Sequence, residues 1–100
     1  MKGLIMRIMA LDIGETRVGV AVSDPGERVA SPVAVLPASE VLNCAKPFQR
    51  ALEDWEPELL LCGLPYTMAG AEGPQAARIR KAAKTISDAC GIPYEFADER

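Results

Sequence analysis

The spacing of apolar residues changes near residue 40, and this change constrains the fold more than any other feature. Before it, three apolar runs at residues 7–13, 17–23 and 28–36 are separated only by short turns. After it, apolar residues recur every three or four positions in two segments, each followed by a short apolar run. A period of two is typical of strands and a period near 3.6 is typical of helices. The predicted order of elements is therefore βββαβαβ.

The first two apolar runs predict a β-hairpin. Residues 7–13 are mostly apolar and end at Gly14, which indicates a buried strand. Residues 17–23 alternate valine with other residues, so Gly19 and Ala21 share the face opposite the valines, where another group must pack closely. The third run contains Pro32, which places a bulge or an edge position in that strand.

The second half of the chain predicts helices that connect parallel strands. We expect a helix over 42–55, a short buried strand over 58–62, a helix from Pro74 to its C-cap Gly91, and a last strand over 94–97. The aromatic residues at core spacing are Phe48, Trp55 and Phe96. The expected fold class is α/β, a mixed five-stranded sheet with helices, in one domain over residues 1–100.

Composition excludes several classes of protein. The formal net charge is −3, so the chain does not coat nucleic acid by bulk electrostatics, and we expect weak binding unless a metal is present. There is no histidine, and the three cysteines, Cys44, Cys62 and Cys90, form no CxxC pair. They are interpreted as reduced core residues of a cytosolic protein. No apolar stretch approaches the ~20 residues of a membrane span.

Acidic residues follow two of the predicted strands. Asp12 ends the first strand, and Asp98 and Glu99 follow the last one. If the last strand lies beside the first, one of these later carboxylates points toward Asp12, and a divalent cation such as Mg²⁺ can then hold the pair together. The alternatives are a turn aspartate that bonds nearby amides and a solvated, charged end of the chain.

A glycine-rich segment and a basic helix face are the remaining candidates. Residues 63–75 lead into a helix whose free amides can receive a phosphate, although the segment lacks the ending of a Walker loop. A purely structural crossover loop is equally compatible with this pattern. Arg78, Lys81 and Lys84 share one side of the following helix, which is either a solvated face or a contact for a nucleic-acid backbone.

Three motifs in this order resemble the YqgF/RuvX family. They are residues 7–24, the segment Gly63-Leu64-Pro65 with Gly70-x-Glu72-Gly73-Pro74-Gln75-Ala76, and Asp98-Glu99-Arg100. The resemblance spans nearly the whole chain. It implies a ribonuclease-H-like fold related to Holliday-junction resolvases, a cytoplasmic location, and a nuclease that matures the 5′ end of pre-16S ribosomal RNA.

The resemblance also implies roles for individual residues. Asp12 and Glu99 would be the catalytic residues and the ligands of Mg²⁺ or Mn²⁺, in a two-metal hydrolysis where one metal activates water and the other stabilises the leaving oxygen. The residues expected to bind the nucleic-acid substrate are Arg17, Gly63, Pro65, Gly73, Gln75, Arg78 and Arg100. Arg17 and Arg100 would assist phosphate binding or hold the acidic cluster.

One departure from the family leaves other functions open. The family continues past its Asp-Glu-Arg motif into a helical segment that supplies a further aspartate, and this sequence ends at Arg100. The chain is therefore interpreted as a fragment or as a domain that lacks efficient metal catalysis alone. A DNA junction resolvase and a noncatalytic RNA-binding assembly module remain alternatives. A nucleotide-binding domain of the sugar-kinase and actin class fits less well, because that class needs two such domains. The sequence leaves the oligomeric state, the RNA or DNA preference and the cleavage site open.

Overall fold

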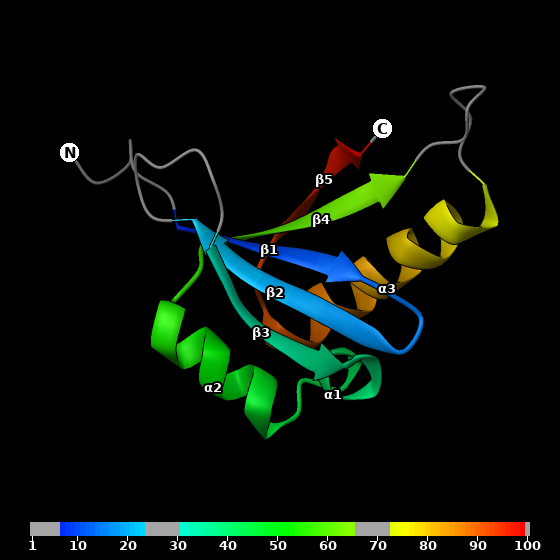
Figure 1. Ribbon diagram of the computed structural model, residues 1–100. Coiled ribbons are helices and arrows are strands. Elements are labelled where there is room, and N and C mark those ends of the chain that lie inside the picture. Colours follow the sequence, from blue (N-terminus) through cyan, green and yellow to red (C-terminus); the bar gives the residue numbers. More distant parts are fainter. Residues whose placement is uncertain (1–6, 24–30, 66–72, 100) are drawn as a thin grey trace.

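The computed structural model of the chain describes residues 7–23, 31–65 and 73–99, with the side chains of 98 and 99 excepted. Its elements are β1 (Ile8–Ile13), β2 (Arg17–Ser23), β3 (Ser31–Pro37), α1 (Ala38–Leu42), α2 (Lys46–Trp55), β4 (Leu59–Pro65), α3 (Pro74–Cys90) and β5 (Tyr94–Glu99). The strands form one sheet (Figure 1), so the mixed five-stranded sheet and its antiparallel meander are confirmed.

The strand order in the sheet is β3-β2-β1-β4-β5. β1 pairs with β2 in antiparallel orientation and with β4 in parallel orientation, and β5 pairs with β4 in parallel orientation. The last strand therefore does not lie beside the first, and the expectation that it might do so is wrong. β4 occupies the side of β1 that the meander leaves free, and β5 pairs with the outer edge of β4.

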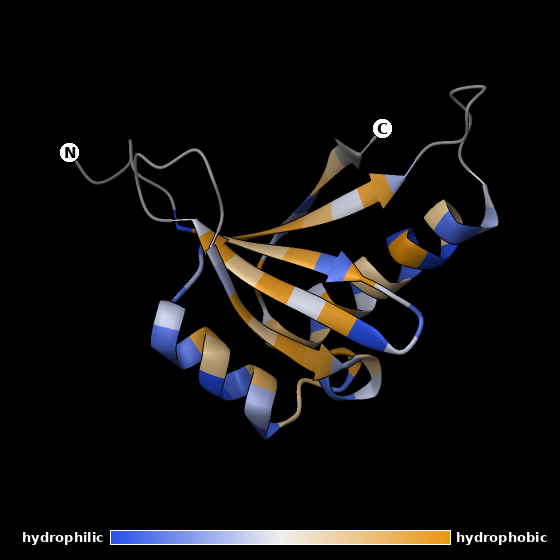
Figure 2. Cartoon of the chain, viewed as in Figure 1, coloured by the Kyte–Doolittle hydropathy of each residue, from blue (hydrophilic) through white to orange (hydrophobic). Residues whose placement is uncertain are grey.

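One face of the sheet is buried beneath the helices. The strands alternate, so that Met9, Leu11 and Val20 are almost fully buried while their neighbours point away. Helix α3 packs on this buried face and contacts it through four residues at helical spacing: Ala76, Ile79, Ala83 and Ile86. Figure 2 shows β2 with alternating strongly and weakly apolar bands, and β1 as an apolar strand interrupted by one hydrophilic band.

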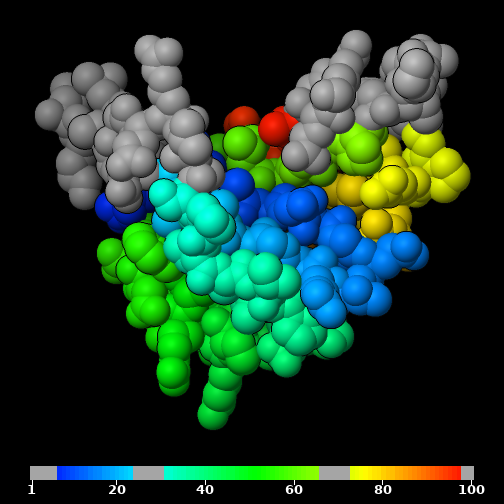
Figure 3. Space-filling model, viewed as in Figure 1, coloured from blue at the N-terminus to red at the C-terminus, as the bar shows by residue number. Residues whose placement is uncertain are grey.

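No described helix covers the opposite face, and Figure 3 shows the surfaces of β1, β2 and β3 directly on this side of the molecule. We call this the open face. Val35 of β3 lies on it with 65% of its surface exposed. Since the other face is buried, the polar side chain of the central strand β1 lies on the open face.

The predicted helix over 42–55 is two helices, which corrects that expectation. Leu42 ends α1, and α2 begins at Lys46, with Cys44 between them in a left-handed conformation at φ 50°. Pro47 lies in the first turn of α2, as expected, and it explains the new start: a proline there lacks only an N–H that the first turn does not use. Phe48 is fully buried, but Trp55 is 40% exposed, so its assignment to the core is wrong.

The third and fourth strands also differ from the expected bounds. β3 is an edge strand with a register shift opposite Val20 and Ala21, next to Pro32, which confirms the expected edge and bulge. The expected start of β3 at residue 28 lies outside the described residues. β4 extends to Pro65, because β5 pairs with it as far as Glu99. β4 is buried on one face only, since Leu59 and Leu61 on the open face are partly exposed.

Candidate nuclease site

Asp12 lies near the end of β1 and points onto the open face. It stands between Leu11 and Ile13, which are almost fully buried, and the alternation of the strand directs its own side chain to the other side. Its carboxylate is exposed, and none of the described residues bonds or pairs with it. A turn aspartate that bonds nearby amides would show such bonds, so this alternative fails for the described residues.

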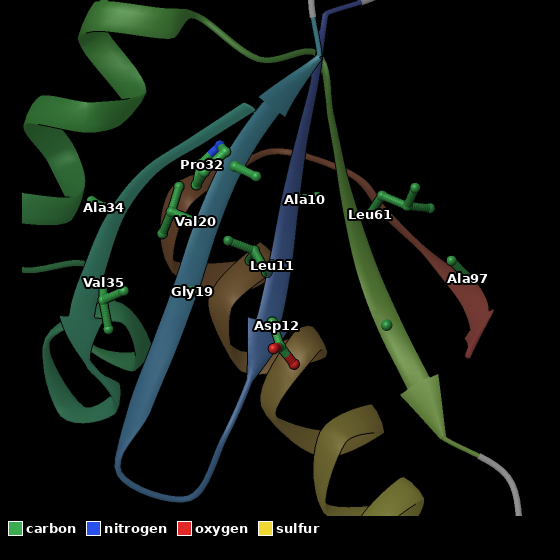
Figure 4. Close-up of a pocket in the computed structure, with 12 residues that line it drawn as sticks. Ala10, Leu11, Asp12, Gly19, Val20, Pro32, Ala34, Val35, Leu61 and Ala97 are labelled. Atoms are coloured by element: carbon green, nitrogen blue, oxygen red, sulfur yellow. The ribbon is translucent and has the colours of Figure 1, made fainter. Parts of the chain in front are cut away.

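Small side chains surround Asp12 and form a shallow pocket. Asp12 pairs with Gly19 across the β1–β2 ladder, and Ala97 lies on the far side of β4 (Figure 4). The pocket has a volume of about 360 Å³. Its lining also includes Gly63, Leu61 and Val35. Gly19 and Ala21 do face this side, but the described chain leaves it open to a ligand instead of packing against them.

The turn after Asp12 requires glycine. The Gly14 amide donates to the carbonyl of Arg17, with 2.9 Å between nitrogen and oxygen. A Cβ at Gly14 would stand 2.8 Å from that same carbonyl oxygen, which is closer than real side chains approach. The amide of Ala38 donates to the carbonyl of Thr16 at 2.8 Å and fastens the turn to α1. The turn is therefore tight, and a hydrogen bond from the start of α1 holds it in place.

Arg78 and Gln75, two of the predicted substrate contacts, lie beside this turn. The Arg78 guanidinium donates through Nη1 to the carbonyl of Gly14, at 3.4 Å in a partly buried setting. Together with Glu15 and Pro74, the two residues line an open groove at the start of α3. The contact joins residues 64 positions apart, so nothing in the sequence could have revealed it.

The remaining predicted contacts lie at several separate places on the sheet and at the start of α3. Gly63 lines the same pocket as Asp12, while exposed Arg17 lines a separate hollow beside Val35 and Pro37. Pro65 ends β4, where its backbone pairs with Glu99. Gly73 caps the start of α3 through extended backbone, and no side chain caps the helix there. Whether the amides at this helix start receive a phosphate stays a prediction.

The second acidic motif is described only through its backbone. Glu99 is the last residue of β5 and Asp98 pairs with Leu64, but the side chains of both residues and all of Arg100 lie outside the described residues. The resemblance to the family loop also rests partly on Gly70 and Glu72, which lie outside them too. Because β4 separates β1 from β5, Asp12 and Glu99 belong to strands about 9–10 Å apart, or two strand spacings.

The basic face of α3 is divided among several contacts. Lys84 donates to Asp88 at 2.9 Å, and this ion pair raises the pKa of Lys84. The guanidinium of Arg80 lies over the ring of Phe96, with 4.8 Å to the ring centroid. Lys81 is exposed. Arg78 alone among these four residues reaches the turn that follows Asp12.

The described residues contain no group of three or more potential metal ligands. The cysteines are free, and burial raises the pKa of Cys62 to about 11 and raises that of Cys90 as well. Such thiols are poor candidates for metal-binding thiolates. The exposed carboxylate of Asp12 lies among small side chains and offers oxygen donors, so it fits a hydrated Mg²⁺ ion, which prefers oxygen ligands and keeps several waters.

Comparison with known proteins places the chain in a family. The sequence model described as "RuvX: Holliday junction resolvase" matches residues 6–100. The chain belongs to the RuvX family. A RuvX relative from Roseiflexus sp. (strain RS-1), named "Putative pre-16S rRNA nuclease", is 39% identical over 94 residues, which cover 94% of this chain and 67% of that protein.

Other relatives agree with this assignment. A protein of the same name from Chloroflexus aurantiacus (strain ATCC 29366 / DSM 635 / J-10-fl) is 39% identical over 93% of this chain and 61% of its own length. The RuvX chain described here thus spans about two thirds of the relatives it matches. The solved structure of Thermus thermophilus RuvC superposes with a TM-score of 0.56 at 16% identity, covering 93% of this chain and 64% of RuvC. The fold is therefore the ribonuclease-H-like fold of that resolvase.

Sequence reasoning missed Glu15, which lines the groove with Arg78, and it missed the contact between Arg78 and Gly14. Gly14 carries a signal, because a glycine between an acidic strand end and a new strand marks a tight turn. Glu15 carries no signal, since an acidic turn residue is most often solvated. In the described part of the chain, no helix is long and apolar enough to span a bilayer.

Proposed function

We propose that this RuvX chain carries the catalytic face of a metal-dependent nuclease that hydrolyses RNA phosphodiesters in the 5′-end processing of pre-16S ribosomal RNA in the cytoplasm. The observation that supports it most is the carboxylate of Asp12, which pairs with none of the described residues and is exposed on the open face beside Gly19 and Gly63. We propose pre-16S ribosomal RNA as the substrate because the RuvX relatives carry the name of a pre-16S rRNA nuclease.

The proposal assigns metal binding to Asp12 and Glu99. The strand alternation that turns Ala97 toward the pocket leads us to expect residue 99 on the same side of the sheet. A divalent cation of the Mg²⁺ or Mn²⁺ type, when bound, supplies positive charge to the phosphodiester and lowers the pKa of a water molecule. The separation of the two strands leaves room for a hydrated ion.

The other residues bind and orient the nucleic-acid strand. Exposed Arg17 lies two positions from Gly19 on β2 and offers a guanidinium to a phosphate near Asp12. Gly63 leaves the floor of the pocket without a side chain, so a sugar–phosphate backbone can approach the sheet closely. The start of α3 at Gly73 offers free amides to a second phosphate. Pro65, Gln75 and Arg100 remain predicted substrate contacts.

Cleavage of a 5′-labelled pre-16S RNA fragment in Mg²⁺ or Mn²⁺ tests this function. Asp12→Asn preserves the size of the side chain but removes its charge, and should lower the rate at least about a hundredfold, because a neutral amide is a much weaker ligand for the divalent cation that the reaction needs. The matched control Asp54→Asn changes an exposed aspartate on α2 and should cut RNA at the rate of the unmodified chain.

The outcomes separate the candidate functions. RNA that binds to the unmodified chain but stays intact would contradict the nuclease proposal and favour an assembly module. A four-way DNA junction belongs in the same assay, because the family description names a junction resolvase. Cleavage of the junction but not of the RNA would transfer the proposal to DNA.

A further inference from the structure

We infer that Arg78 is a positioning residue that holds the β1–β2 turn in place for Asp12; the assignment rests on the proposed nuclease function. Arg78 lies one turn into α3, and its Nη1 donates to the carbonyl of Gly14 at 3.4 Å. Gly14 follows Asp12 by only two positions. The guanidinium is thus bound to the backbone that carries the catalytic carboxylate.

The turn is fixed from both of its sides. On one side, the carbonyl of Thr16 accepts the amide of Ala38 at the start of α1. On the other side, the carbonyl of Gly14 accepts Arg78 from α3, while the Gly14 amide is used within the turn. Without Arg78, the carbonyl of Gly14 loses its described partner, and α3 loses its side-chain tie to the turn.

Fixing this turn constrains Asp12. The turn joins the last residue of β1, Ile13, to the first residue of β2, Arg17, and Asp12 is paired with Gly19 just inside it. A side chain that acts on a substrate must be held to within about 0.5 Å, and misplacement by ~1 Å can cost a hundredfold in rate. Arg78 is therefore assigned to act through Gly14 and not on the reacting atoms.

A direct phosphate contact is the competing role for Arg78, and the two roles predict different measurements. Loss of a phosphate contact weakens RNA binding and lowers the salt dependence of that binding by about one unit of slope. Loss of a positioning contact lowers kcat at saturating RNA and leaves the salt slope unchanged. It also loosens the turn in the free protein, where no RNA or metal is present.

Amide hydrogen exchange at Gly14 tests the positioning role directly. We expect Arg78→Met to accelerate exchange of the Gly14 amide about fivefold in metal-free protein, as for the loss of one hydrogen bond. Arg78→Lys keeps a donor of similar reach and should restore most of the protection. Arg50→Met removes a charged guanidinium from an exposed position on α2 and serves as the matched control. The melting temperature of each variant shows that the fold persists.

Cleavage and salt titrations of the same variants complete the test. Arg78→Met should lower kcat roughly ten- to a hundredfold with an unchanged salt slope, while Arg50→Met stays at the level of the unmodified chain. If the Gly14 amide exchanges at the same rate in Arg78→Met as in the unmodified chain, the inference is overturned. If the salt dependence of RNA binding is also reduced in that variant, Arg78 contacts a phosphate instead. If exchange accelerates but the unmodified chain cuts neither RNA nor junction DNA, the turn-holding role stands and the nuclease proposal fails instead.

Discussion

Neighbouring positions around the β1–β2 turn are constrained by different physical effects. Asp12 is free of described contacts, so its identity matters for chemistry and little for stability. Gly14 is constrained by space, because a Cβ there meets the carbonyl oxygen of Arg17 at 2.8 Å. Gly19 is less constrained, since a Cβ there meets only the Cβ of Asp12, at 3.6 Å. The same substitution should thus have opposite effects at the two glycines.

Gly14→Ala should lower the free energy of unfolding by roughly 1–3 kcal/mol, because the turn must open to accept the methyl group. Gly19→Ala should leave it unchanged or raise it by about 0.5–1 kcal/mol, since alanine loses less backbone freedom in a strand. Urea denaturation of both variants measures the difference. Equal effects of the two substitutions would contradict the steric explanation.

At the residue scale, the sequence was enough to single out Asp12 as a site residue but not to identify the residues that lie around it. A carboxylate that interrupts an apolar strand stands out in any sequence, and strand alternation alone directs it to one face. The contact between Arg78 and Gly14 depends on how α3 is placed over the sheet, which no local pattern records. Pocket residues such as Ala97 also carry no signal in the sequence, because alanine is common in strands of any kind.

Three elements end or are interrupted at left-handed backbone. Cys44 follows α1 at φ 50°, Glu56 caps α2 at φ 46°, and Gly91 caps α3 at φ 76°. Gly91 is the residue type that adopts this conformation without strain, which is why the end of α3 was predictable. Cysteine and glutamate give no such signal, and this explains why the break between α1 and α2 was not foreseen.

The two helix caps support a paired prediction. Gly91→Ala should destabilise the protein by about 1 kcal/mol through backbone strain alone, because no atom lies within 4 Å of the added Cβ. Glu56→Gly should stabilise it by a few tenths to about 1 kcal/mol, since the αL strain is removed and the exposed ion pair with Arg7, at 4.0 Å, contributes little. Thermal unfolding of the single variants measures both, and two changes of the same sign would contradict the explanation.

At the scale of the whole molecule, the order of elements was predictable apart from the break between α1 and α2, but the order of strands in the sheet was not. Periodicity identifies each strand and helix separately, and short turns make the first three strands neighbours. Residues before Leu59 and Tyr94 do not show which edge each parallel strand joins. The expectation that the last strand lies directly beside the first was wrong for this reason, although Ala97 of β5 still lines the pocket that contains Asp12.

Burial of Cys62 links global stability to alkaline pH. The thiol lies in β4 with no exposed surface, and burial raises its pKa from 9.0 to about 11. The unfolded chain therefore releases this proton near pH 9 while the folded chain keeps it, so stability is full below pH 9 and falls as the pH rises toward 11. Cys62→Ala removes this loss, which should be on the order of 2 kcal/mol.

Urea denaturation of both proteins across this pH range measures the difference in slope. All other side chains are the same in both proteins, so their contributions cancel in the comparison. Parallel pH profiles of the two proteins would contradict the explanation.

The central place of β1 has a consequence for how the molecule acquires its structure. Its pairing with β2 closes a turn of only a few residues, so this ladder can form within microseconds. Its pairing with β4 brings Ile8 to Leu59 and must first overcome the entropy of a much longer closed loop. We therefore expect the edge of the pocket at Gly19 to exist early in folding, and the edges at Gly63 and Ala97 to arrive late. The surface around Asp12 is then among the last parts of the sheet to be completed during folding.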